Sequence, residues 1–334
     1  MNAKHRRRRL ACVLVATAIA AFTYSAPSMA AAAADPGVTA CDRLASSPHD
    51  RKAVAPAVQQ ILDLDPAIAT CREALQKHPK HPRLQFLLGS LLDELPRPRW
   101  TDSPGADLLK KSADQGYLVA LYRLGKSYLK TWRRGKRRKG AQIMLQAARL
   151  GHLQAQAELP YYAGRMRIEK DRKEALRWGE AAIRRGSYDA MAAMALSNIL
   201  IMPDVKKYPK AVEYLYKADR AGSLDAMALL GRLQVFPFAP NGLRDLLPEN
   251  HYGGMRRMLD AANMGNKRAA FYLGLLYAGS TISVSPHREK MIHWFCRAGE
   301  RGRYMVAETL EKDVSTYRCP VQKKPKKSSR NLNQ

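Results

Sequence analysis

The sequence lacks the short motifs that mark several common catalytic sites. It contains no glycine-rich phosphate loop, no His-Glu-x-x-His zinc motif and no Gly-x-Ser-x-Gly nucleophile elbow. His78 and His81 lie three residues apart, but prolines surround them, so we interpret both as turn residues rather than metal ligands. His293 lies near Cys296 at a helical spacing, which favours a packed or surface residue over a nucleophile pair. The sequence therefore predicts no cofactor, no metal and no enzymatic activity.

Cysteine is scarce, with five in 334 residues. Cys12 lies in the N-terminal segment discussed next, and Cys41, Cys71, Cys296 and Cys319 remain. Neither neighbouring pair has the close spacing of a zinc or redox site. Pairing of Cys41 with Cys71 and of Cys296 with Cys319 would place one local disulfide near each end of the chain. In a repeat array the units at the two ends need such stabilisation most, because each has only one neighbouring unit. We expect these two disulfides; the other two connectivities and four reduced thiols are the alternatives.

A long apolar run is also lacking, because the run over residues 10–22 is too short for an ordinary membrane span. It follows a charged start with a cluster of arginines at 6–9 and precedes a small-x-small cleavage site at 28–30. This order of charged, apolar and small residues predicts a secretory signal over residues 1–30. We therefore expect a periplasmic or secreted protein, with an uncleaved membrane anchor as the alternative.

Acidic residues are few compared with basic ones. The chain has 29 Asp and Glu against 57 Lys and Arg, and its formal net charge is +28 at pH 7. The densest basic segment spans residues 130–139 and contains Lys130, Arg133, Arg134, Lys136, Arg137, Arg138 and Lys139. We expect this segment to be a loop between two helices of one hairpin and to bind an anionic partner, such as an acidic protein face, a polymer or a membrane surface. The alternative is a solvated loop that serves solubility.

What the sequence does contain is an internal repeat marked by glycine. The glycines lie 35–43 residues apart, at Gly116, Gly151, Gly186, Gly222, Gly265 and Gly302. Four residues before each stands Ser or Ala, four residues after stands Ala or, once, Val, and eight residues after stands Leu or Met. A period of this length indicates stacked supersecondary units. Glycine suits the left-handed residue that ends a helix, and the small residues let two antiparallel helices approach closely.

The repeat also carries a longer motif, Ala-x-x-x-Leu-Gly-x-x-Tyr, which begins at Ala120 and again at Ala269. With the small-x-x-aromatic pattern of Ala175 and Trp178, it resembles the Sel1-like repeat, a longer relative of the tetratricopeptide repeat, over about residues 105–312. The resemblance implies an all-α, right-handed α-solenoid of stacked helical hairpins that mediates protein–protein interaction. Pro160 replaces the second glycine of its unit, so we expect that helix to kink or end early.

Four segments follow from these patterns. Residues 1–30 are the signal, 31–98 a leader and divergent helical cap, 99–312 the repeat array, and 313–334 a basic tail that is too polar to fold. Residues 236–250 lengthen one interval, and their apolar start predicts an insertion folded back on the array.

We favour an exported, non-enzymatic scaffold that binds a protein partner, with an anionic envelope component as a second kind of partner. A secreted enzyme of the beta-lactam-binding repeat type is one alternative, but such proteins have cysteines in every unit, and this chain does not. A basic nucleic-acid-binding protein is the other alternative. The export signal argues against it, and the sequence shows no module that combines stacking aromatic residues with basic ones.

Overall fold

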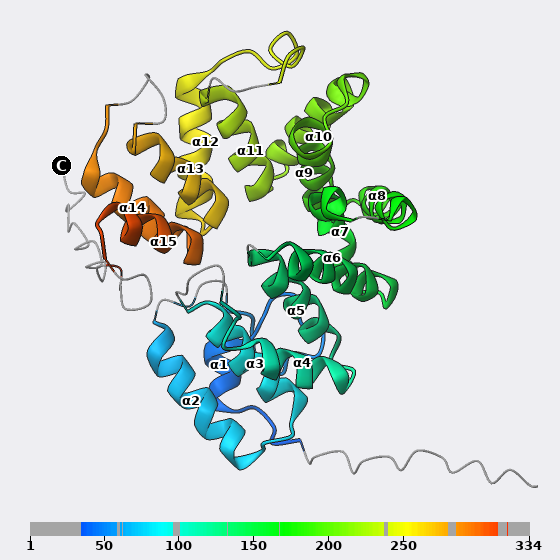
Figure 1. The fold of residues 1–334 in the computed structure, drawn as a ribbon, viewed down its shortest axis with the longest axis vertical. Coiled ribbons are helices and arrows are strands. Elements are labelled where there is room, and N and C mark those ends of the chain that lie inside the picture. The colour runs from blue at the N-terminus through cyan, green and yellow to red at the C-terminus, as the bar shows by residue number, and fades with distance from the viewer. Residues whose placement is uncertain are drawn as a thin grey trace, which may run out of the picture. The chain divides into compact units, whose positions relative to one another are not determined.

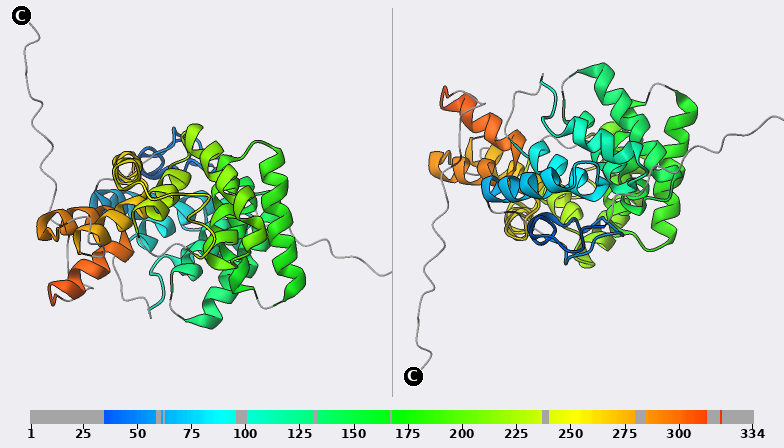
Figure 2. Two further views of the ribbon diagram at one scale, coloured as in Figure 1. Left: turned by 90° about the horizontal axis from the view of Figure 1, so that it is seen from above. Right: turned by 90° about the horizontal axis from the view of Figure 1, so that it is seen from below.

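A computed structural model shows the fold of this chain. It describes residues 35–58, 61, 63–95, 101–131, 133–166, 168–236, 240–279, 285–312 and 319, with only the backbone described for 300 and 301. The expected signal over 1–30 lies outside the described residues, as does the expected tail apart from Cys319. Every regular element in the described ranges is helical, which confirms the all-α prediction (Figures 1 and 2). None of the described helices is both long enough and apolar enough to cross a membrane.

The divergent front unit consists of α1 (Ala40–Ala45), α2 (Leu64–Lys77) and α3 (Pro82–Asp93). Proline occupies the first turn of α3, where its missing N–H leaves no hydrogen bond unmade. Leucine side chains form much of the buried face of α3, and they include Leu84, Leu87 and Leu91. Burial of these side chains holds the front unit against the first repeat.

Both expected disulfides are present. Cys41 of α1 bonds to Cys71 of α2, with their Cα atoms 4.7 Å apart. Cys296, in the last hairpin, bonds to Cys319, with their Cα atoms 5.7 Å apart. Each bond closes a local stretch of chain near one end of the protein, so the pairing by neighbours in sequence is confirmed.

Six helical hairpins follow the front unit within the described residues (Figure 1). They are α4 (Ala106–Asp114) with α5 (Leu118–Lys130), α6 (Arg134–Arg149) with α7 (Leu153–Glu158), α8 (Glu169–Arg184) with α9 (Tyr188–Leu196), α10 (Tyr208–Arg220) with α11 (Leu224–Val235), α12 (His251–Asn263) with α13 (Lys267–Tyr277), and α14 (Arg288–Arg297) with α15 (Glu300–Thr309). In the first five turns the repeat glycine has a φ between 81° and 93°, as a left-handed helix end requires.

The sixth turn corrects the predicted register. Its left-handed residue is Gly299, with a φ of 75°, and Gly302 lies inside α15. A Cβ atom on Gly302 would lie 1.8 Å from the carbonyl oxygen of Phe295 on α14. Gly302 is therefore required by the close approach of two helices, and not by a turn.

The small residues of the repeat lie at helix crossings, as predicted. The alanines before and after the turns are buried at Ala120, Ala147, Ala155, Ala182, Ala190, Ala218, Ala226, Ala261 and Ala269. A second set of close contacts was not predicted. A Cβ on Gly140 of α6 would lie 2.8 Å from the Gly125 oxygen of α5, and one on Gly231 of α11 would lie 2.5 Å from the Gly254 oxygen of α12. Consecutive hairpins thus also approach through paired glycines.

The middle of the array is irregular, as Pro160 predicts. Helix α7 ends at Glu158, and the chain continues as a 3₁₀ helix, η1 (Leu159–Arg165). Helix α9 passes into a π-helical turn, η2 (Ser197–Ile201), and a short 3₁₀ turn, η3 (Val205–Lys207), precedes α10. Proline removes one backbone hydrogen bond and crowds the preceding turn, which explains why α7 is short.

The insertion after α11 folds back on the array, as predicted. The side chains of Leu243 and Leu247 are buried against α10 and α11. Arg244 donates to the carbonyl oxygens of Leu233 and Phe236, at 3.1 and 2.8 Å. These bonds satisfy carbonyls at the end of α11, while residues 237–239 lie outside the described ranges.

Candidate functional site

The basic segment at 130–139 is helical, and its prediction as a loop was wrong. Lys130 is the last residue of α5, and α6 begins at Arg134, so only residues 131–133 connect the two helices. The buried positions of α6, which include Ala141 and Met144, have helical spacing, and the basic residues before them extend the same helix. Lysine and arginine are good helix formers, so their charge does not prevent this extension.

The segment joins α5 of one hairpin to α6 of the next, and not two helices of one hairpin as predicted, and its cations make different contacts. The ammonium groups of Lys136 and Lys139 lie 5.3 and 5.9 Å from the centre of the Tyr128 ring, within cation–π distance. Arg133 lies 3.6 Å from Asp102, and Lys136 also pairs with this carboxylate. Lys130 points elsewhere, to the end of α3. These cations therefore do not form one continuous charged loop.

The remaining three arginines of the segment are Arg134, Arg137 and Arg138. Arg134 and Arg138 are exposed and Arg137 is half-buried, and none of the three contacts an acidic side chain among the described residues. Arg165 of η1 interacts electrostatically with Arg137. Desolvation of the Arg165 guanidinium, together with the charge of Arg137, lowers the pKa of Arg165. The Arg165 side chain lies 5.7 Å from the Tyr162 ring and stays accessible to solvent. We call Arg134, Arg137, Arg138 and Arg165 the basic surface.

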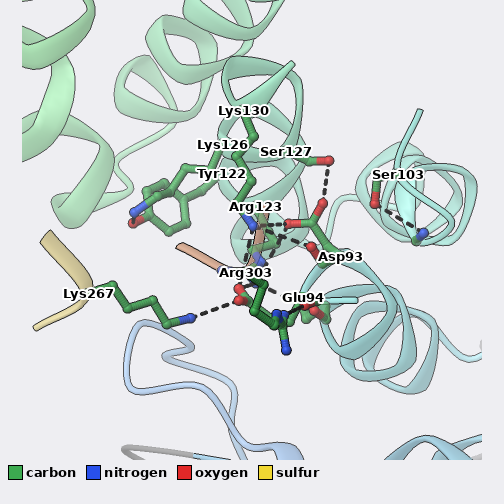
Figure 3. Close-up of polar contacts among 12 residues, drawn as sticks. Asp93, Glu94, Ser103, Tyr122, Arg123, Lys126, Ser127, Lys130, Lys267 and Arg303 are labelled. Carbon is green, nitrogen blue, oxygen red and sulfur yellow. Dashed lines mark hydrogen bonds and ion pairs between the residues drawn. The ribbon is translucent and has the colours of Figure 1, made fainter. Parts of the chain in front are cut away.

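A buried acidic pair lies at the end of α3, in contact with α5 (Figure 3). Asp93 is fully buried, and it accepts hydrogen bonds from Ser127 at 2.6 Å and from Lys130 at 2.8 Å. The guanidinium of Arg123 lies 3.7 Å from Asp93 and also binds Glu94. Two carboxylates thus face two cations of one helix, which compensates the desolvation of the buried Asp93 charge.

Glu94 of this pair also contacts the last two hairpins. Lys267 at the start of α13 donates to the Glu94 carboxylate at 2.7 Å, and Arg303 of α15 donates to the Glu94 carbonyl oxygen (Figure 3). These residues lie 173 and 209 positions away from Glu94 in the sequence. Burial raises the pKa of the Glu94 carboxyl, but Lys130, Lys267 and Arg123 outweigh it and hold the pKa well below its usual range. We use the name Asp93–Glu94 cluster for the two acidic residues and their partners, which are Arg123, Ser127, Lys130, Lys267 and Arg303.

A second polar group joins α5 to α7. The hydroxyl of Tyr122 donates to Glu158 at 2.9 Å, and Lys126 lies 3.0 Å from the same carboxylate. Burial raises the pKa of Glu158, but Lys126 and the hydrogen bonds outweigh it and lower the pKa. The His152 ring stacks on Tyr122 at 4.4 Å, and its Nδ1 accepts the N–H of Ala155 at 3.1 Å. Burial, with His49 as the next contribution, lowers the pKa of His152 to about 4, so the ring is neutral at pH 7.

A third group joins η1 to α11 and α13. Asp225 accepts hydrogen bonds from Tyr161 at 3.1 Å and from Asn266 at 2.9 Å. Arg268 lies 3.8 Å from Asp225 and 4.5 Å from the centre of the Tyr161 ring. Burial raises the pKa of Asp225, but Arg268 and the hydrogen bonds lower it overall. Like the other two groups, this one pairs its charges internally, so its role is to connect hairpins.

The structure places the predicted site residues as follows. The seven cations of the segment stay close in sequence but divide among the Asp93–Glu94 cluster, the Tyr128 ring, the Asp102 carboxylate and the basic surface. The sequence did not predict Arg165 as a site residue, because it lies outside the basic segment and only Arg167 is a basic residue close to it in the sequence. His78, His81 and His293 do not come together, and the described residues contain no group of three His, Cys, Asp or Glu side chains that could hold a metal ion.

Comparisons with known proteins give a likeness to solved structures. No family model matches the chain, and no curated protein matches it. A Sel1 repeat protein from Oxalobacter formigenes is 22% identical, covers 68% of this chain and 93% of its own, and has a TM-score of 0.39. A protective antigen present in uropathogenic Escherichia coli strains, which displays an SLR fold, is 18% identical over 73% of this chain and 59% of its own, with a TM-score of 0.34.

These TM-scores lie below 0.5, so the resemblance to the Sel1-like repeat rests on the residues of this chain. Five of the six predicted repeat glycines end a helix in the left-handed conformation, and the alanines on either side of them are buried at helix crossings. The helices form consecutive antiparallel hairpins over the region that the motif covers. The glycine pattern, the small residues and the hairpins that they form agree with the resemblance to the Sel1-like repeat that the sequence shows.

Proposed function

We propose that this chain is a non-catalytic scaffold that binds an acidic face of a partner protein through the basic surface. The observation that carries the proposal is the contrast, among the described residues, between cations that pair with carboxylates and cations that do not. The cations of the three polar groups that connect hairpins are paired with carboxylates, whereas Arg134, Arg137 and Arg138 contact no acidic group there. Exposed charges of one sign raise the rate at which oppositely charged partners associate.

The start of α6 adds to this positive field. No side chain caps the helix, since Arg133 stands at the N-cap position without a side-chain hydrogen bond. The free N–H groups of the first turn carry partial positive charge, and basic side chains beside them raise the local potential further. A carboxylate-rich partner would offset both contributions. The fold does not require basic side chains at the start of α6, and binding of an acidic partner would explain them.

We also propose that the protein acts outside the cytoplasm, in the periplasm or in the medium. The charged, apolar and small residues of 1–30 support export, and the two disulfides are compatible with an oxidising compartment. An anionic component of the envelope is then a second kind of partner that the basic surface could reach.

The test compares two triple variants of the full chain with the same change in charge. One carries Arg134→Gln, Arg137→Gln and Arg138→Gln. The control carries Arg177→Gln, Arg184→Gln and Arg220→Gln, three exposed arginines outside the basic surface. Immobilised poly-L-glutamate is the probe, and anionic vesicles and duplex DNA are separate arms.

We expect the first variant to bind poly-L-glutamate about tenfold more weakly than the parent at low salt, and the control to bind within about twofold of the parent. Binding of the parent should weaken as salt rises, since exposed charges are screened over about 8–10 Å at physiological ionic strength. Equal binding of the two variants would reject the basic surface as the site. Tighter binding of the parent to vesicles or DNA than to poly-L-glutamate would reject an acidic protein as the partner.

A further inference from the structure

A groove of about 380 Å³ lies between α4, α5 and α6. Its walls combine apolar and aromatic side chains with the polar side chains of Lys110, Asp114, Lys139 and Gln146. The apolar side chains include Leu121, Leu124, Ile143 and Leu150. Leu150 exposes 61% of its surface, which is unusual for a large apolar side chain unless something covers it.

The residues of the groove follow two helical stripes. On α6, the lining residues Lys139, Ile143, Gln146 and Leu150 are spaced by four, three and four positions, so they share one face. Three turns of helix correspond to roughly 16 Å, which sets the length of the groove along α6. On α5, Leu121 and Leu124 form the facing wall with the Tyr128 ring. A trough lined by two helices over three turns suits a third helix that lays one apolar ridge into it.

The charges around the groove select the kind of helix. Lys110 is paired with Asp114 at 2.5 Å, so the charges of this pair cancel. Lys139 has no such carboxylate partner among the described residues; it lies over the Tyr128 ring together with Lys136. The end of the groove near Tyr128 is therefore positive, and it continues into the basic segment of α6. A partner that fits must be apolar along one side and acidic on the flanks.

We propose that the groove binds an acidic, amphipathic helix of the partner protein. Its apolar side chains, spaced by three and four residues, pack on Leu121, Ile143 and Leu150, and its carboxylates face Lys139. This inference rests on the proposed function, because it takes the acidic partner as given and adds the apolar contact that selects it. Charge brings the partner to α6, and the groove then distinguishes an ordered apolar stripe from any other acidic chain.

The experiment measures the fluorescence anisotropy of labelled synthetic peptides with the full chain, its disulfides intact. One 16-residue peptide consists of glutamates with four leucines placed so that they form one helical stripe. A second has the same composition with the leucines rearranged so that no stripe forms. We expect the ordered peptide to bind at least about tenfold more tightly, since only it can bury its leucines together.

Two matched pairs of variants locate the site. Gln146→Glu places a negative charge in the groove, and Gln142→Glu places one on an exposed position of α6 that does not line it. Leu150→Ser removes an apolar contact, and Leu153→Ser removes an apolar side chain that is 54% exposed and lies outside the lining. Gln146→Glu and Leu150→Ser should each weaken binding of the ordered peptide by about tenfold, and the two controls should stay within about twofold of the parent.

The outcomes separate this inference from the proposed function. If both peptides bind equally and both lose affinity in the triple arginine variant, the groove is rejected and the basic surface stands. If the ordered peptide binds but Gln146→Glu and Leu150→Ser leave it unchanged, the groove is also rejected. If the groove variants weaken binding while the triple arginine variant has no effect on either peptide or on poly-L-glutamate, the groove stands and the basic surface is rejected.

Discussion

Replacement of Asp93 by Asn tests whether the Asp93–Glu94 cluster holds the front of the array together. Asp93 is fully buried and bonds to Ser127 and Lys130 of α5. Asparagine has nearly the same shape and retains one acceptor oxygen, so Asp93→Asn removes the negative charge with little change in packing. The Lys130 and Arg123 side chains would then lose that negative charge and keep the Glu94 carboxylate, with which both also pair.

The magnitude follows from how far the cations are buried. Removal of one partner of a fully buried ion pair costs about 3–5 kcal/mol. Here the Lys130 and Arg123 side chains keep 29% and 23% of their surface exposed, so water compensates part of the lost attraction. Asparagine can still accept a hydrogen bond from Ser127. We therefore expect Asp93→Asn to lower the free energy of unfolding by about 2–3 kcal/mol.

The assay is urea unfolding followed by circular dichroism, with hydrogen exchange of the α3 and α5 amides as a local measure. Asp114→Asn is the control, because Asp114 is 60% exposed and its pair with Lys110 should contribute only about 0–1 kcal/mol. Lys130→Met should be less destabilising with Asn at position 93 than in the parent, since the ion pair between Lys130 and Asp93 is then already lost. A free energy of unfolding for Asp93→Asn within about 0.5 kcal/mol of the parent would refute the reasoning.

Three further expectations concern other parts of the fold. Cys41→Ala with Cys71→Ala should lower the free energy of unfolding by about 3 kcal/mol, which urea unfolding with and without reductant checks; an equal stability would contradict it. His152 has a pKa of about 4 in the fold against 6.5 when unfolded, so its contribution is complete above pH 6.5 and is lost as the pH falls toward 4. His152→Asn keeps the cap and should flatten the stability–pH curve between these values, whereas an unchanged slope would assign the dependence to other groups. Ala226→Phe should cost about 1–3 kcal/mol by overpacking a buried crossing, and an unchanged melting temperature would show that this alanine does not mark the crossing.

Local requirements explain why most of the fold could be predicted. A helix that ends and reverses needs a left-handed residue, and Gly116 and Gly265 meet that need with almost no tertiary information. Buried crossings need small side chains, so the positions of Ala226 and Ala269 also follow from spacing. Gly302 shows where this reasoning fails. A close approach between helices demands glycine as strictly as a turn does, and spacing alone does not distinguish the two.

The polar groups could not be predicted, because they depend on how the hairpins lie relative to one another. Glu94 meets Lys267 and Arg303 only after the intervening hairpins have stacked, and none of the three residues belongs to the repeat pattern. Arg165 joins the basic surface because η1 follows a different path from a regular α-helix. A small error in the geometry of each repeat would accumulate over such distances, so sequence patterns indicate the repeats and not their long-range contacts.

The basic start of α6 conflicts with local stability, and this conflict is the strongest reason to assign it a function. Cations near a helix N-terminus are unfavourable, since they face the positive end of the helix dipole, and each contributes roughly 0.3–1 kcal/mol when exposed. The segment has no acidic residue in its first turn and no side-chain cap to offset them. The ring of Tyr128 and the carboxylate of Asp102 relieve only the cations on one side, Arg133, Lys136 and Lys139. Arg134, Arg137 and Arg138 could be replaced by glutamate or glutamine with a gain in helix stability, and this is why we propose that the arginines contact an anionic partner.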